Sequence, residues 1–521
     1  MTSPMPSPRS GAAVPPAEPQ QPALLGAARR RLAAWWEERP LTVTLIVAAG
    51  LRLAAAWLSP GFAFHDDHFE VVEIAQRWVD GGRDWLGSSD SLRSLVYPGL
   101  HWALFSALER LGLTDPQTKM LVVRLLNAAW SLLSVLFGYR IAEAVAGRAR
   151  ARVAGLLLAA FWLAPFSAVR DLVEVACQPP IVIALWLLVR APGGPRGRDA
   201  LLAGIWLGAA FTIRFQTLVI PGTLGLVLLL RRRIAPAALL GVGTVLSATI
   251  LQGGSDWIGY GRPFSSFLAY LHFNSDPRMI GTFPTGPWYR YLETLTGVLV
   301  PPTSLLLLFG VLWTARRHAL LFWPVFAFLA LHSVYPGKQE RFLFPVLPPL
   351  LVLAAIGSHE LAVHLRVLAT RPRLVRGLWA WFWVANTLLL AAYTTNYSKR
   401  SRIAPLSWLH DRPDVRGVVL ETSEAKPPYV PLFYLGKPVP VFELPQGKSV
   451  DALRMELGAA RPNYVVLTGE RDLDARVARL RPLFPQLDRV ASFSPGVVDW
   501  LLHRMNPRHN VNLTAYVYRA D

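Results

Sequence analysis

An acidic motif follows the first apolar stretch of the chain, in the sequence FHDDHFEVVE from Phe64 to Glu73. Adjacent carboxylates such as Asp66 and Asp67 repel each other, so a pair of this kind suits general-base catalysis, a metal site or proton coupling. On a helix, Asp66, Glu70 and Glu73 would share one face while Asp67 faces elsewhere. The plainer alternative is an acidic first turn of an ordinary helix. That alternative leaves the flanking histidines unexplained.

Charged residues also stand at the ends of other apolar stretches. In RDLVE, Arg170 and Glu174 are four residues apart, so they either form a local ion pair or line a cavity. Arg214 ends another apolar stretch and would reach lipid headgroups or bind a phosphate. In YPGKQERFLFPVLPPL, Lys338 and Arg341 precede a proline-broken helix. Two cations there suit a lipid-borne phosphate, with simple interfacial anchoring as the alternative.

Aromatic residues gather in a long stretch from Ser255 to Leu292, which includes Trp257, Trp288 and Tyr289. They suit an aromatic belt at the membrane interface or a surface for sugars, and composition favours the belt. We find no Walker loop, dinucleotide-binding glycine pattern or Ser-His-Asp signature in a suitable context. The two histidines of the acidic motif with Asp66 are a weak metal signal. We therefore expect neither a metal nor a cofactor.

Composition indicates which kind of structural element positions these residues. The chain has 521 residues, of which 53% are apolar, and its mean hydropathy is positive, so we predict a polytopic α-helical membrane protein. The net charge of +19 comes from arginines in short runs between apolar segments, a pattern of membrane topology rather than of nucleic-acid binding. The single cysteine, Cys177, excludes an intrachain disulfide framework and a cysteine metal site.

Hydropathy predicts about 11 spans, each near the ~20 residues that cross a bilayer or somewhat shorter. They fall at 41–58, 119–145, 153–170, 175–190, 200–213, 215–230, 234–251, 292–314, 319–334, 343–364 and 375–396. Residues 200–230 are alternatively one long helix. If the spans alternate from an inside N-terminus, nearly every arginine run lies on the cytoplasmic face, as the positive-inside rule requires.

The opposite face then receives all the motifs above. It holds the loops 59–118 and 252–291 and the tail after 397, while SLVYPGLHWALFSALERLGL within the first loop reads as an interfacial helix. After residue 400, short β-like runs alternate with helix-like stretches. We therefore predict a disordered tail over 1–28, a transmembrane module over 29–399 and a small extracytoplasmic α/β domain over 400–521.

Four stretches, in order, resemble motifs of the multi-spanning mannosyltransferases of glycosyltransferase family twenty-two. HDDHFE is similar to the family's Asp-Glu-x-Phe/Trp motif, and RDWLGSSDSLRSLVYPGL to its Trp-Glu-Trp, Arg-Ser and Tyr-Pro pattern. The stretch from SDWIGYG to PWYRYL looks like Asp-x-x-x-Tyr-Gly…Asn…Pro-Trp-x-Tyr, and KQERFLFPVLPPL like Lys-Glu-x-Arg-Phe-x-x-Pro-x-x-Pro. The chain departs from these motifs at Asp67, at Asp84-Trp85-Leu86 and at Gln339.

The resemblance implies the GT-C architecture and an inverting enzyme of N-glycan or GPI-anchor type that takes a sugar, commonly mannose, from a polyprenyl (dolichyl) phosphate. The acceptor would be a lipid-linked glycan or another extracytoplasmic acceptor. Asp66 would be the base, with Asp67 as the alternative base or orienting group. Lys338, Arg341 and Arg214 would neutralise the leaving phosphate, so no metal is required. The other expected substrate-binding residues are Arg170, Glu174, Asp256, Asn274, Trp288 and Glu340.

Two rival functions fit a chain of this kind. A multi-spanning lipid or solute transporter or flippase also carries polar residues in its bundle, but here the charges gather on one face and no internal repeat relates two halves. A non-catalytic scaffold for the C-terminal region would leave the acidic and basic motifs without a purpose. The Arg-, Ala- and Leu-rich composition favours a bacterial inner membrane over the endoplasmic reticulum, with the active site on the extracytoplasmic side.

Overall fold

The computed structural model describes residues 34–82, 92–280, 285–422, 429–507 and 510–520. It places the backbone but not the side chains of Asp66, Pro277 and Ile280. The chain divides into two compact units, Met1–Val43 and Thr44–Asp521, and every candidate site residue lies in the second. The predicted tail over 1–28 and the Asp84-Trp85-Leu86 sequence lie outside the described residues.

Within the described ranges, five helical stretches are long and apolar enough to cross a membrane. They are Pro40–Leu58 (α2), Pro116–Ala146 (α6), Ile234–Tyr260 (α13, η3 and α14), Glu340–His364 (η4 and α20) and Pro372–Thr394 (α22). A sixth span results if α17 (Arg290–Val298) and α18 (Thr303–Trp313), which are bent by 118° at the break between them, are counted together. A mostly helical membrane protein is thus confirmed, whereas the count of 11 spans is not.

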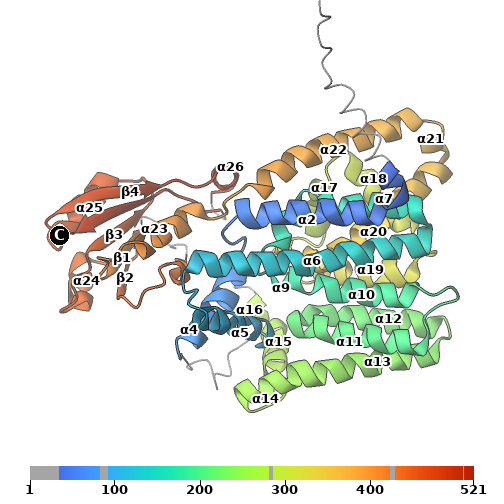
Figure 1. The fold of residues 1–521 in the computed structure, drawn as a ribbon, viewed down its shortest axis with the longest axis horizontal. Coiled ribbons are helices and arrows are strands. Elements are labelled where there is room, and N and C mark those ends of the chain that lie inside the picture. The colour runs from blue at the N-terminus through green and yellow to red at the C-terminus, as the bar shows by residue number, and fades with distance from the viewer. Residues whose placement is uncertain (1–33, 83–91, 281–284, 423–428, 508–509, 521) are drawn as a thin grey trace, which may run out of the picture. The chain divides into compact units, whose positions relative to one another are not determined.

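The other predicted spans correspond to shorter helices. These are α7 (Arg148–Ala160), α8 (Leu163–Ala168), α9 (Val173–Ala176), α10 (Gln178–Val189), α11 (Gly197–Ile213), η2 (Phe215–Leu218), α12 (Val219–Leu230) and α19 (Ala319–Val334). Outside the apolar segments lie α15 (Ser265–Ser275), α16 (Pro277–Ile280), α21 (Arg366–Ala369) and α23 (Arg400–His410). Figure 1 shows α11, α12 and α13 lying side by side.

Residues 200–230 do not form one long helix. Helix α11 ends at Ile213, and Arg214 adopts an extended conformation with φ −145° and ψ 107° before the 3-10 turn η2 begins. The break places the Arg214 side chain at the junction of two apolar helices instead of on a regular helix face.

Close contact between helices depends on paired glycines. A Cβ on Gly204 of α11 would lie 2.1 Å from the carbonyl oxygen of Leu240 on α13. A Cβ on Gly357 of α20 would lie 1.9 Å from the carbonyl oxygen of Gly310 on α18. Because no side-chain atom fits in either place, these glycines let the backbones touch, as small residues do between membrane helices.

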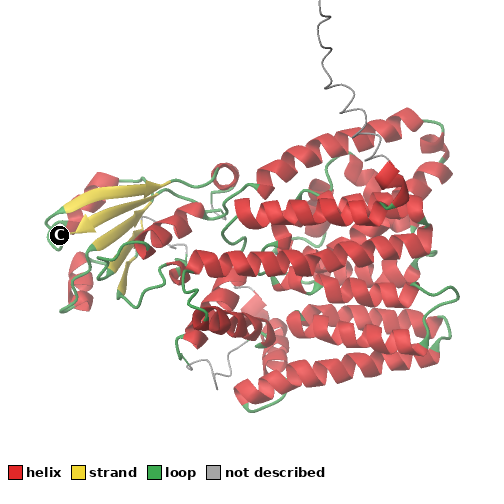
Figure 2. Cartoon of the chain, in the orientation of Figure 1, coloured by secondary structure: helices red, strands yellow, loops and turns green. Residues whose placement is uncertain are grey.

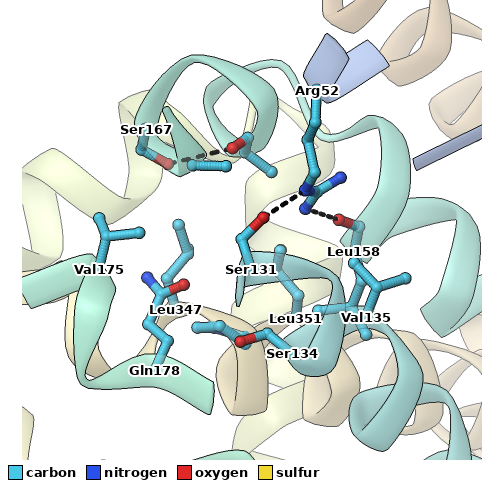
Figure 3. Close-up of a pocket in the computed structure, with 13 residues that line it drawn as sticks. Arg52, Ser131, Ser134, Val135, Leu158, Ser167, Val175, Gln178, Leu347 and Leu351 are labelled. Carbon is cyan, nitrogen blue, oxygen red and sulfur yellow. Dashed lines mark hydrogen bonds between the residues drawn. The ribbon is translucent and has the colours of Figure 1, made fainter. Parts of the chain in front are cut away.

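A buried arginine lines a small cavity among the apolar helices (Figure 3). Arg52 of α2 donates to the Ser131 hydroxyl at 2.8 Å and to the carbonyl oxygens of Leu158 and Ala159 at 3.2 and 3.3 Å. Those carbonyls belong to the last turn of α7, where helices leave acceptors without partners. Arg52 therefore caps α7, as cationic side chains commonly do at helix C-termini, and we assign it no substrate.

The first loop contains the acidic motif on a distorted helix. Residues His65–Asp67 form α3, His68–Val72 form the π-helical turn η1, and Glu73–Val79 and Val96–Arg110 form α4 and α5. The predicted face of Asp66, Glu70 and Glu73 includes a side chain outside the described residues; of the other two, Glu70 pairs with Arg93, and Glu73 Oε1 lies 3.3 Å from His68 Nε2. A π-helical turn changes the periodicity and is frequent at functional sites.

The C-terminal region forms a small mixed sheet (Figure 2). Its strands are β1 (Val418–Thr422), β2 (Val441–Leu444), β3 (Tyr464–Thr468), β4 (Leu487–Phe493) and β5 (Ala515–Ala520), in the order β2-β1-β3-β5-β4. Strand β1 runs parallel to β2 and β3, and β5 is antiparallel to β3 and β4. Helices α24 (Val450–Leu457), α25 (Leu473–Leu480) and α26 (Val497–Met505) and the turn η5 (Leu432–Tyr434) complete the region.

One hydrophobic core joins the first loop to this sheet. It includes Phe62 and Val72 of the first loop, Phe105 of α5, Val418 of β1 and Val517 of β5, all buried. A second core on the other side of the sheet is local to the C-terminal region. The sheet and the first loop therefore stabilise each other by burying shared apolar surface.

Candidate active site

Three charged side chains from separate elements meet in the interior. Arg214 Nη2 lies 3.2 Å from Glu174 Oε1, and Arg341 Nη1 lies 3.5 Å from the same oxygen. We call these three residues the Glu174 cluster. Glu174 is fully buried, and the two arginine side chains are 11% and 5% exposed. Among these three side chains, two guanidinium groups stand against one carboxylate.

Breaks in regular structure bring the cluster together. Glu174 lies on the short helix α9, Arg214 in the gap between α11 and η2, and Arg341 in the 3-10 turn η4 that leads into α20. Gln178 on α10 donates to the carbonyl oxygen of Phe344 at 2.8 Å and so ties η4 to the helix after Glu174. Charged groups in an apolar bundle are costly and persist where they pair or line a cavity.

The Glu174 carboxylate forms ion pairs, but its oxygens accept no well-aligned hydrogen bond from the described residues. A buried polar group without such a bond calls for a further partner. The Phe342 ring lies below both cations, 5.0 Å from the Arg214 guanidinium carbon and 5.6 Å from that of Arg341. Two guanidinium groups side by side suit the oxygens of an anion such as a phosphate.

Asn274 lies near the cluster on α15. Its side-chain oxygen accepts the Tyr335 hydroxyl at 2.8 Å, and its amide donates to the carbonyl oxygen of Tyr270 at 2.8 Å. The Tyr270 ring packs on Phe215, directly after Arg214, with ring centroids 5.5 Å apart. Helix α15 thus forms a polar and aromatic wall beside the arginines.

Lys338 and Glu340 take other partners. The Lys338 ammonium donates to the carbonyl oxygens of His332 at 3.0 Å and Ser333 at 2.9 Å, and also to that of Tyr335. These carbonyls end α19, so Lys338 caps that helix. Burial lowers the pKa of Lys338. Glu340 is 62% exposed and lies 4.0 Å from Arg290, outside the Glu174 cluster.

Gln339 replaces the acidic residue expected from the resemblance, and its side chain contacts the cluster. Its Oε1 accepts a hydrogen bond from Arg341 Nε at 2.7 Å. The Gln339 backbone is held by the Tyr291 hydroxyl, 3.2 Å from its amide nitrogen and 3.3 Å from its carbonyl oxygen. A neutral amide fixes the guanidinium without cancelling its charge.

The acidic motif reaches this cluster through Phe64. The Arg341 guanidinium lies 5.9 Å from the centre of the Phe64 ring, and that ring also packs edge-on against Phe344. Asp67, three residues later, accepts hydrogen bonds from the backbone amides of Ala63 at 2.8 Å and Phe64 at 3.1 Å. Asp67 therefore holds the turn that carries Phe64 against Arg341.

Asp67 is almost completely buried, with 2% of its surface exposed. Burial raises the pKa of its carboxyl from 3.8 to about 7, assisted by the negative charge of Asp171 and opposed by the two backbone amides and Arg170. A value near neutrality is typical of groups that gain or lose a proton during catalysis. The backbone of Asp66 lies in α3, and its side chain lies outside the described residues.

Arg170 and Glu174 do not form the local pair. Arg170 instead donates from Nη1 to the carbonyl oxygens of Ser59 and Gly61, both at 2.7 Å, and from Nη2 to the Ser59 hydroxyl at 2.7 Å. It is 2% exposed and stacks on Phe166. Arg170 thus fixes the chain between α2 and the acidic motif, while Glu174 pairs with more distant arginines.

A second buried polar group was not predicted. Asp171 Oδ1 accepts from the Asn127 side chain at 2.8 Å and lies 3.2 Å from His101 Nε2, whose other ring nitrogen lies 3.0 Å from the Tyr97 carbonyl oxygen. His101 and Asp171 contribute acid–base side chains, whereas Tyr97 contributes its backbone carbonyl oxygen. Tyr97 and His101 lie in the segment read as interfacial, and Asp171 beside Arg170. The i, i+4 spacing of Tyr97 and His101 was the available signal.

Two predicted residues lie apart from both groups. Asp256 on α14 is buried and accepts from the Ser266 backbone amide at 2.9 Å and from its hydroxyl at 2.8 Å, which joins α14 to α15. Trp288 is 70% exposed and packs edge-on against Tyr289. In the described part of the chain, no three His, Cys, Asp or Glu side chains lie close enough together to hold a metal ion.

Comparison with known proteins gives a consistent answer. Residues 43–413 match the model of the Alg9-like mannosyltransferase family. The chain is 24% identical over 389 residues to GPI mannosyltransferase 3 of Yarrowia lipolytica, covering 72% of this chain and 71% of that one. It is 22% identical over 384 residues to Mannosyltransferase APTG1 of Arabidopsis thaliana, with 69% of each covered.

A solved structure has a similar fold. The crystal structure of ArnT from Cupriavidus metallidurans bound to undecaprenyl phosphate superposes with a TM-score of 0.59 at 14% identity, covering 91% of this chain and 97% of that one. The family match spans well over half of the chain and confirms the resemblance carried by the acidic and KQERF motifs. The chain belongs to the Alg9-like mannosyltransferase family and is a membrane-embedded mannosyltransferase.

Proposed function

We propose that this mannosyltransferase takes mannose from a polyprenyl-phosphate donor and transfers it, with inversion, to a lipid-linked or other extracytoplasmic glycan. The Glu174 cluster carries the proposal, because two arginines from separate elements converge on one buried carboxylate beside the acidic motif. Arginine suits phosphate oxygens through its planar fork of donors. A protein of similar fold, ArnT, was solved bound to undecaprenyl phosphate, which supports a lipid phosphate as the donor's carrier.

The reaction is a single displacement at the anomeric carbon. The acceptor hydroxyl gives its proton to a carboxylate of the acidic motif, and its oxygen forms a bond to the anomeric carbon of mannose. The bond from that carbon to the phosphate oxygen breaks, and its electron pair stays on the phosphate. The product polyprenyl phosphate carries an additional negative charge. Arg214 and Arg341 stabilise this charge as it develops.

The two aspartates of the acidic motif have different proposed roles toward the acceptor. We propose Asp66 as the base and Asp67 as the group that holds the turn, since both Asp67 oxygens accept backbone amides. A pKa near 7 also makes Asp67 the alternative base. Arg170 holds the preceding carbonyls and acts through this turn. We propose that Asn274, on the helix beside Arg214, contacts the donor, and substrate contacts by Lys338, Glu340, Asp256 and Trp288 stay predictions.

The placement in the cell follows the predicted topology. With arginine runs on the cytoplasmic side, the acidic motif and the Glu174 cluster face the extracytoplasmic side. A bacterial inner membrane stays our prediction, and the endoplasmic reticulum stays its alternative. Transport is not favoured, because the family and the named relatives are mannosyltransferases.

Transfer of radiolabelled mannose tests the donor class and the proposed roles of Arg341 and Asp66. Purified protein receives polyprenyl-phosphate [14C]mannose and a glycolipid extract from the source organism. We expect Arg341→Ala to lower kcat/KM for the donor by roughly 10²–10³-fold, as the loss of a charge-stabilising donor does. Asp66→Asn should abolish transfer. Arg290→Ala, which removes a half-exposed arginine outside the cluster, is the matched control.

Three results would contradict these roles. If the wild type transfers nothing from this donor, the donor class is wrong. If Asp66→Asn and Asp67→Asn both retain transfer, the base does not belong to the acidic motif. If Arg341→Ala and Lys338→Met weaken donor and acceptor use equally, neither residue acts on the phosphate.

A further inference from the structure

A short segment of the C-terminal region, residues 429–435, is fixed to the first loop. The Phe433 backbone amide donates to Glu73 Oε1 at 2.9 Å. The Tyr434 ring stacks on His68, with ring centroids 5.3 Å apart and an interplanar angle of 10°, while Phe62 stacks on His68 at 4.9 Å. His68 and Tyr434 are both buried. The segment therefore has a defined position against the acidic motif.

Tyr429 begins this segment and stays open to its surroundings. It is 67% exposed, although Phe433 and Tyr434 of the same segment are buried. Its ring lies 4.4 Å from that of His65 and 5.6 Å from that of Phe69. His65 directly precedes the two aspartates. An exposed aromatic ring thus borders the residues that we assign to the acceptor hydroxyl.

Successive residues of the motif contact different neighbours. Phe64 contacts Arg341 and Phe344, on the side of the proposed phosphate. His65 contacts Tyr429, which comes from the C-terminal region. An in-line displacement requires the acceptor to approach away from the leaving phosphate. The surface made by His65 and Tyr429 is therefore available to the acceptor, because it is not the surface that holds the arginines.

We propose that Tyr429 binds the acceptor, by packing its ring against the apolar face of a sugar on the glycan that receives mannose. The inference rests on the proposed function and adds to it a residue from the C-terminal region. Tyrosine suits this role because its ring provides a large, rigid apolar surface with few rotatable bonds. Stacking, rather than the hydroxyl, carries the contact.

Acceptor and donor titrations separate this role from others. Transfer from polyprenyl-phosphate [14C]mannose is measured while the glycolipid extract is varied, and then while the donor is varied. Tyr429→Ala should raise the apparent KM for the extract by about five- to tenfold, and should change kcat and the donor KM by less than about twofold. Tyr429→Phe, which keeps the ring, should stay within about twofold of the wild type.

Trp500→Ala is the matched control. Trp500 is a half-exposed aromatic on α26 that stacks with Arg504, and its loss should leave both KM values unchanged. An unchanged acceptor KM in Tyr429→Ala, or an equal rise in the donor KM, overturns the inference while transfer itself persists. Loss of function in Tyr429→Phe overturns the stacking contact. Failure of the wild type to use the donor instead overturns the proposed function.

Discussion

Glu174→Gln is the sharpest test of the Glu174 cluster, because it changes stability and ligand binding in opposite directions. The carboxylate lies 3.2 Å from Arg214 and 3.5 Å from Arg341. At an effective dielectric constant of ~20, each of these contacts is worth about 5 kcal/mol before desolvation. Removing one partner of a buried pair destabilises proteins by about 3–5 kcal/mol, since the other charge stays buried. We expect the ligand-free variant to be less stable by about this amount.

The same substitution removes the carboxylate charge that competes with a phosphate for the two guanidinium groups. Polyprenyl phosphate should therefore bind the variant at least about tenfold more tightly, which corresponds to about 1.4 kcal/mol. Because the product then leaves more slowly, kcat and the donor KM should fall together. Thermal unfolding in detergent, with and without polyprenyl phosphate, measures the first effect, and product inhibition of mannose transfer measures the second.

The C-terminal sheet offers a matched control. Glu421 on β1 is also buried and pairs with two arginines, Arg476 and Arg479. Glu421→Gln should destabilise the protein without changing the effect of polyprenyl phosphate. The reasoning is refuted if the lipid stabilises Glu174→Gln no more than the wild type, or if the ligand-free variant unfolds at the wild-type temperature.

Two further predictions concern the first loop. The pKa of Asp67 is raised from 3.8 to about 7, so the folded protein holds this proton more tightly than the unfolded chain, and its contribution makes stability fall as the pH rises from about 4 to 7. Unfolding titrations of wild type and Asp67→Asn should show this slope only in the wild type; a slope in both assigns it to another group. Gly61 has φ +93°, and a Cβ there would lie 1.9 Å from the Ser398 carbonyl oxygen. Gly61→Ala should therefore cost roughly 3 kcal/mol in chemical unfolding, and wild-type stability would contradict the packing.

Local composition was enough to predict most of the helices. An apolar run in lipid must satisfy its own backbone groups, so it is helical wherever it lies. The same reasoning could not count the spans, because helices such as α10 and α12 are shorter than the usual crossing length and depend on their neighbours. It also could not locate the helix break at Arg214, where a charged residue separates two apolar segments.

For the candidate site, the sequence could suggest residue types but not the partners of each side chain. Sequence spacing favoured a local pair between Arg170 and Glu174, but Arg170 bonds to the carbonyls of Ser59 and Gly61 instead. A buried charged side chain pairs with the groups that packing brings next to it, and for Arg170 these groups are distant in the sequence. For the same reason, no local sequence pattern predicted the contact of Tyr434 with His68.

The core shared by the first loop and the sheet sets an order of events during synthesis. Phe62 and Val72 leave the ribosome long before Val517, which packs in the same core. At roughly 5–20 residues per second, the acidic motif waits tens of seconds for the surface that buries it. A nascent chain interrupted before the sheet would therefore already hold its apolar helices while its first loop still exposed hydrophobic side chains. Chaperones and proteases could recognise that exposed surface.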